Sequence, residues 1–160
     1  MRKYNSLDKA LIIYVRYIVV AFVQSSPNRN KEGIIIIMDK LLDLTRDFDA
    51  AKAAFEAYLD EYDRADDKIH LKIVHTYGVV DAAEDIARRM GLGEEDVQLA
   101  KVIGLLHDIG RFEQIKRFDS FEPGTMEHAA YGAQLLFGPE KMIRRFVKDD
   151  RFDSLICTAI

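Results

Sequence analysis

The chain has 160 residues, which is enough for one domain with a hydrophobic core and short for two. Its hydrophobic fraction of 49% and charged fraction of 31% are ordinary for a globular protein and argue against disorder. The net charge of −4 argues against a nucleic-acid polymer as partner, and a single cysteine excludes a disulfide framework and a cysteine-based zinc site.

Residues 1–37 differ from the rest of the chain in charge and in pattern. They carry six Lys/Arg and two Asp/Glu, so the net charge of −4 divides into +4 here and −8 in residues 38–160. Their apolar run, residues 11–23, is shorter than the roughly 20 residues that a membrane span needs, and Arg16 interrupts it as a signal-peptide core. We therefore expect no membrane partner and a cytoplasmic location.

Two origins are open for this atypical N-terminal extension. The codons for Lys31-Glu32-Gly33 can contain a bacterial ribosome-binding sequence, and Met38 follows at a suitable distance. Residues 1–37 are then a translated leader, and the protein starts at Met38. The alternative is a genuine N-terminal helix followed by a β-prone linker.

Two helices are predicted next, at residues 48–62 and at about residues 68–90. The first is alanine-rich and has one apolar face. In the second, Leu71, Val74 and Gly78 recur at helical spacing, so we expect them to face the core together with His75. His70 points away from His75 at 3.6 residues per turn and is expected on the surface. A histidine on such a face is more often a hydrogen-bonded core residue than a metal ligand.

Residues 97–106 are apolar almost all the way round, which predicts a buried central helix. It ends in His107 and Asp108, and Gly110 is the expected stop signal. A buried imidazole and carboxylate are costly unless they are paired, and a metal ion is an economical partner. For an isolated His–Asp pair, a cap or a local hydrogen bond is the commoner explanation.

The position of the preceding helix favours the metal site. The short link between the two helices makes them antiparallel neighbours, so that His75 comes level with His107 and Asp108. With no cysteine cluster, the ligands must come from His, Asp and Glu.

The rest of the chain is predicted as a loop and further helices. Residues 109–124 are expected to form the loop, in which Arg111 is near enough to Asp108 to reach a phosphate held by the metal. A helix at residues 126–137 carries His128 on an apolar face with Gly132. Further helices are expected from residue 139 and over residues 152–160.

Taken together, His75, the segment from His107 to Arg111, and His128 resemble the HD-domain superfamily of metal-dependent phosphohydrolases over about residues 68–160. The resemblance implies an all-α, HD-domain-like helical bundle of about five or more helices within residues 38–160. It implies a divalent metal ion (Mn, Mg, Co, Fe, Ni or Zn) bound by His75, His107 and Asp108. His128 would join a second metal or face the substrate phosphate, and Arg111 would contact that phosphate.

The implied activity is hydrolysis of a phosphate ester in a nucleotide or another small phosphorylated metabolite, with Asp108 and Arg111 in catalytic roles. The family completes its site with a further Asp on a later helix, whereas Asp149, Asp150 and Asp153 follow His128 too closely to serve. We therefore expect the domain to be C-terminally incomplete. Two alternatives are a degenerate module that binds a nucleotide or a partner without turnover, and a di-iron oxygenase, which the shortage of ligands disfavours.

Overall fold

The computed structural model describes residues 47–122 and 124–160. Within these residues the protein is built from helices and contains no strand, so the predicted all-α class is confirmed. The prediction for residues 1–37 lies outside the described residues. In the part of the chain that is described, no helix combines the length and the apolar composition needed to cross a bilayer.

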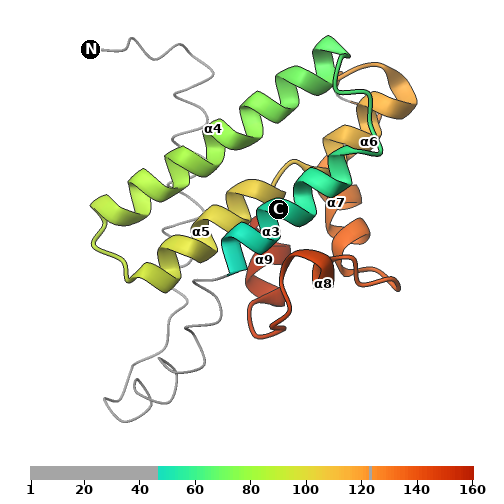
Figure 1. Cartoon of the computed structure of the whole chain (residues 1–160). Coiled ribbons are helices and arrows are strands. Elements are labelled where there is room, and N and C mark those ends of the chain that lie inside the picture. The colour runs from blue at the N-terminus through green and yellow to red at the C-terminus, as the bar shows by residue number, and fades with distance from the viewer. Residues whose placement is uncertain (1–46, 123) are drawn as a thin grey trace, which may run out of the picture.

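A hairpin of two long helices forms the frame, and Figure 1 shows its two helices running side by side. Helix α4 (Asp67–Arg89) begins at Asp66, whose side chain accepts hydrogen bonds from the backbone N–H groups of Lys68 and Ile69. Gly91 ends the helix in the left-handed conformation, with φ +70°. Helix α5 (Glu94–Leu106) follows with three acidic residues in its first turn, where the helix dipole favours them.

Helix α5 is the predicted central helix and is buried along most of its length. Its Gly104 lies against the backbone of α4, where a Cβ would come within 3.3 Å of Val80 Cα. This close approach fixes which side of α4 faces the core: the buried residues are Ile69, Thr76, Val79, Val80, Ala83 and Ala87.

The predicted inward face of α4 is therefore wrong in part. Leu71 is 59% exposed and Val74 is 57% exposed, and a Cβ on Gly78 would meet nothing within 4 Å. Apolar residues occupy more than one side of this helix, so spacing alone does not decide which side is buried. His75 lies at the edge of the buried side, half-buried, and His70 is exposed as predicted.

The predicted loop at residues 109–124 is also wrong, because helix α6 (Ile109–Phe118) occupies most of it. Ile109, Phe112 and Ile115 are buried at helical spacing, and the positions between them hold Gly110 and the polar residues Arg111, Glu113 and Gln114. Gly110 has no positive φ, so it does not act as the stop signal that we expected. The helix instead ends at Asp119, whose φ of 49° is left-handed.

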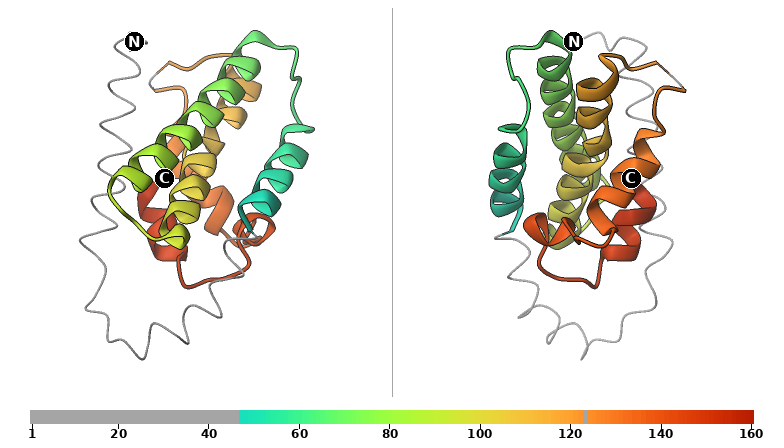
Figure 2. Two further views of the ribbon diagram at one scale, coloured as in Figure 1. Left: turned by 60° about the vertical axis from the view of Figure 1, so that its left-hand side comes forward. Right: turned by 90° about the vertical axis from the view of Figure 1, so that its right-hand side faces the viewer.

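The remaining helices complete the core around α5 and α6. Helix α3 (Asp47–Leu59) lies on one side of the hairpin, and α7 (His128–Phe137) and α9 (Asp153–Ala159) lie on the other, with the short α8 (Ile143–Phe146) near one end (Figure 2). An aromatic cluster joins α3 to α6. Its members are Phe55, Tyr58, Tyr62 and Phe112.

Candidate metal centre

The centre lies at the junction between α5 and α6, where the two helices are separated by His107 and Asp108. His107 caps the C-terminus of α5, and Asp108 precedes α6 with a non-helical φ of −112°. Both residues are buried. His107 Nδ1 lies 2.7 Å from the carbonyl oxygen of Gly104. Because a carbonyl can only accept, Nδ1 carries a proton here, and Nε2 is the ring nitrogen that faces Asp108.

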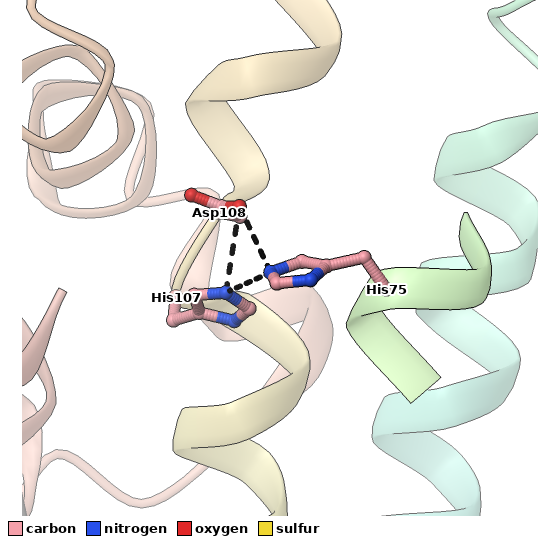
Figure 3. A group of neighbouring side chains, drawn as sticks. All are labelled: His75, His107 and Asp108. Atoms are coloured by element: carbon pink, nitrogen blue, oxygen red, sulfur yellow. Dashed lines mark hydrogen bonds and ion pairs between the residues drawn. The ribbon is translucent and has the colours of Figure 1, made fainter. Parts of the chain in front are cut away.

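His75 reaches this junction from the middle of α4. Its Nε2 lies 3.3 Å from His107 Nε2, and each of these two nitrogens lies 3.5 Å from Asp108 Oδ2 (Figure 3). Each of the three residues offers one ligand atom, and these atoms lie within 4.8 Å of one another. Two imidazole nitrogens and a carboxylate oxygen that converge in this way are a donor set that divalent transition metals prefer. The residues therefore fit the metal that the sequence predicts.

The protonation state of Asp108 suits a ligand. Burial raises the pKa of its carboxyl group, but hydrogen bonds with His107 and His75 and the charge of Lys72 outweigh burial and hold the pKa well below its ordinary value. Asp108 is therefore ionised at neutral pH, as a carboxylate ligand must be.

Lys72 is a member of the site that sequence reasoning missed. Its Nζ lies 2.6 Å from Asp108 Oδ2, and its side chain is only 14% exposed. It also lies over the ring of Phe121, 5.5 Å from the centroid. The available signal was its spacing, because a residue three positions before His75 shares the same side of a helix.

His128 and Arg111 approach the other oxygen of Asp108. His128 Nε2 lies 3.6 Å from Oδ1, and Arg111 Nε lies 3.8 Å from it. Arg111 Nη1 donates to Gln114 Oε1 at 2.7 Å and to the carbonyl oxygen of Phe121 at 3.3 Å. Its Nε is buried and makes no hydrogen bond to any residue that the structure describes. The acidic group that faces this Nε is the Asp108 carboxylate, whose Oδ1 lies 3.8 Å away.

The pKa of His128 is lowered, first by burial and then by the positive charge of Arg111. Its ring is therefore mainly neutral near pH 7, with a lone pair available to a metal or a hydrogen-bond donor. His128 stands on the Oδ1 side of Asp108, outside the group formed by His75, His107 and Asp108. Its assignment as a metal or phosphate ligand stays a prediction.

A contact between two glycines places His128. A Cβ on Gly110 would lie 2.2 Å from the carbonyl oxygen of His128 and 2.9 Å from the backbone nitrogen of Gly132. The sequence singled out both glycines, Gly110 as a stop signal and Gly132 as a neighbour of His128. Their role in the structure is to let α6 and α7 cross with their backbones in contact.

The later carboxylates are engaged elsewhere. Asp149 accepts hydrogen bonds from Arg151, and Asp153 pairs with Arg144. Glu113 and Asp119, the two acidic residues closest after Asp108, bind Tyr62 and Lys68 respectively. The expectation that Asp149, Asp150 and Asp153 do not complete the ligand set stays a prediction.

Comparison with known proteins bears on the same residues. The family model described as HD domain matches residues 73–157, a range that includes His75, His107, Asp108 and His128. No curated protein and no solved structure matches the chain.

Proposed function

The chain belongs to the HD-domain family, and from this premise we propose that it hydrolyses a phosphate ester of a nucleotide or another small phosphorylated metabolite. His75, His107 and Asp108 would hold the divalent metal ion. Such an ion supplies Lewis-acid polarisation of a phosphoryl oxygen and activation of water at neutral pH.

The observation that carries the proposal is the excess of positive charge around the ligand group. Lys72 pairs with one oxygen of Asp108, and Arg111 lies near the other, so two cations face a single carboxylate before any metal is counted. A site in which positive charges outnumber negative ones favours an anionic substrate. A phosphate has several acceptor oxygens, and it can take both a metal contact and the hydrogen bonds of a guanidinium.

The contacts of each side chain suggest its role in binding the metal or the phosphate. Asp108 is ionised and lies between the imidazole groups and Arg111, and it would offer Oδ2 to the metal. Gln114 holds Arg111 beside Asp108 Oδ1, where the guanidinium group would bind the phosphate and stabilise charge that develops on it. His128 on the same side would bind the phosphate or a second metal ion.

The experiment is an assay of phosphomonoester and nucleotide hydrolysis with Mn²⁺, Mg²⁺ or Co²⁺. We expect turnover that needs the metal and that falls by at least about 100-fold in Asp108→Asn and His75→Gln, because each removes a ligand. His70→Gln is the matched control, since His70 lies on α4 but is exposed. Metal binding without product from any of these substrates would contradict the proposal.

A second candidate is a module that binds a nucleotide or a partner without turnover. The pairing of Asp149 and Asp153 with arginines favours it, because the ligand group found in the described residues has three members. This candidate predicts a higher Tm in the presence of a nucleotide and no product.

A further inference from the structure

Lys72 takes the place at Asp108 where a metal ligand bond would form. Oδ2 is the oxygen that lies 3.5 Å from both His75 Nε2 and His107 Nε2, and Lys72 Nζ lies 2.6 Å from this same oxygen. The pair is largely shielded from solvent, since the side chains of Lys72 and Asp108 are 14% and 11% exposed. An ammonium group thus neutralises the carboxylate that the predicted metal needs.

An ammonium and a divalent ion cannot share this oxygen at low cost. Two cations within about 4 Å repel each other by several kcal/mol in a partly buried site, and the repulsion doubles for a divalent ion. The entry of the metal must therefore move the ammonium away from Oδ2. Lys72 can make this move without any change in α4, because four methylene groups carry its charge.

Phe121 indicates where the displaced ammonium would remain. Lys72 Nζ already lies over the Phe121 ring, and Arg111 donates to the backbone carbonyl oxygen of the same residue. The face of an aromatic ring attracts a cation. Phe121 therefore contacts both cations, Lys72 through its ring and Arg111 through its carbonyl oxygen, and it would keep the ammonium group near the site.

We propose that Lys72 exchanges partners when the site is loaded: it pairs with Asp108 in the metal-free protein, and it binds the phosphoryl group of the substrate once the metal has taken Asp108. The second half rests on the proposed function. Lys72 would then be a phosphate-binding residue from α4, and Arg111 would be its counterpart from α6.

The first test measures the affinity for Mn²⁺ alone by calorimetry, with no phosphate present. Lys72→Met keeps most of the side-chain volume and removes the competing charge, so we expect Mn²⁺ to bind about tenfold more tightly than in wild type. Lys68→Met is the matched control, because Lys68 lies one turn earlier and pairs with Asp119. Unchanged or weaker Mn²⁺ binding by a folded Lys72→Met would overturn the exchange, as a merely structural lysine would give that result.

The second test measures the binding of inorganic phosphate to the Mn²⁺-loaded protein. We expect Lys72→Met to weaken phosphate binding at least about fivefold and Lys72→Arg to retain most of it, since the charge is kept. Equal phosphate affinity in Lys72→Met and wild type would overturn the phosphate role. A wild-type chain that binds no Mn²⁺ would overturn the whole exchange, whereas binding of both ligands without turnover would contradict only the proposed hydrolysis.

Discussion

Replacing Gly110 by alanine should test how closely α6 and α7 must approach. The new Cβ would lie 2.2 Å from the carbonyl oxygen of His128 and 2.9 Å from the backbone nitrogen of Gly132, whereas ordinary contacts of a Cβ begin at 3.4 Å. Both neighbours are backbone atoms, so no side-chain rotation relieves the clash. The first turn of α7 must therefore withdraw by roughly 1 Å, and overpacking of this kind typically costs about 1–3 kcal/mol.

We expect Gly110→Ala to lower the free energy of unfolding by about 2–3 kcal/mol, measured by urea denaturation followed by circular dichroism. Gly78→Ala is the control, because Gly78 lies in α4 and its Cβ would meet nothing within 4 Å. It should stabilise the protein by about 0.8–1.0 kcal/mol through helix propensity. A Gly110→Ala protein as stable as wild type would refute the argument that the two backbones must touch.

Three further outcomes follow from the site and the core. In the metal-free protein the imidazole of His128 should titrate below 6.5 by NMR, since burial and Arg111 lower its pKa. The unfolded chain then binds more protons, so the contribution of His128 to stability declines as the pH falls from 6.5 toward the lowered pKa. Arg111→Gln should raise the midpoint of the His128 titration, and an unchanged midpoint would contradict the role of the Arg111 charge. Phe112→Ala, at the fully buried centre of the aromatic cluster, should cost about 3–5 kcal/mol in urea denaturation, and a loss below about 1 kcal/mol would disagree. Gln114→Ala should weaken phosphate binding by the Mn²⁺-loaded protein about tenfold and leave Mn²⁺ affinity unchanged, because Gln114 holds Arg111 and contacts none of the three metal-ligand residues. Equal losses of phosphate and Mn²⁺ affinity would contradict this role and show that the whole site is disrupted.

Sequence alone predicted the features that depend on strong local patterns. The apolar run of α5 and the short link before it predicted a buried helix in an antiparallel hairpin, and both are confirmed. That hairpin was sufficient to bring His75 level with His107 and Asp108, and the structure places their ligand atoms together. The length of each helix and the short connection between them fix how far along the helix axis each residue lies, and this was enough to predict which histidines come level with each other.

The features that sequence missed depend on rotation about the helix axis. Leu71 and Val74 were predicted to be buried, but the close contact of Gly104 with Val80 turns a different side of α4 toward the core. The same rotation carries Lys72 to Asp108. Such contacts arise between elements far apart in sequence, and the spacing within one helix does not contain them.

Helix α6 was missed for a different reason. A glycine after a helix commonly ends it, and Gly110 was given that meaning. In the structure the interruption comes earlier, at His107 and Asp108, and Gly110 belongs to the first turn of the next helix. The recurrence of Ile109, Phe112 and Ile115 at helical spacing was the better signal.

The interruption between α5 and α6 gives the site a polarity that comes from the backbone itself. The peptide dipoles of α5 end here with their negative pole, and those of α6 begin here with their positive pole, because the first helix ends at Leu106 and the second begins at Ile109. Carbonyl groups at the end of one helix favour a cation, and N–H groups at the start of the next favour an anion. One break in an otherwise helical stretch thus places opposite partial charges of the backbone on either side of His107 and Asp108, which suits the cation and the anion that the proposed function requires.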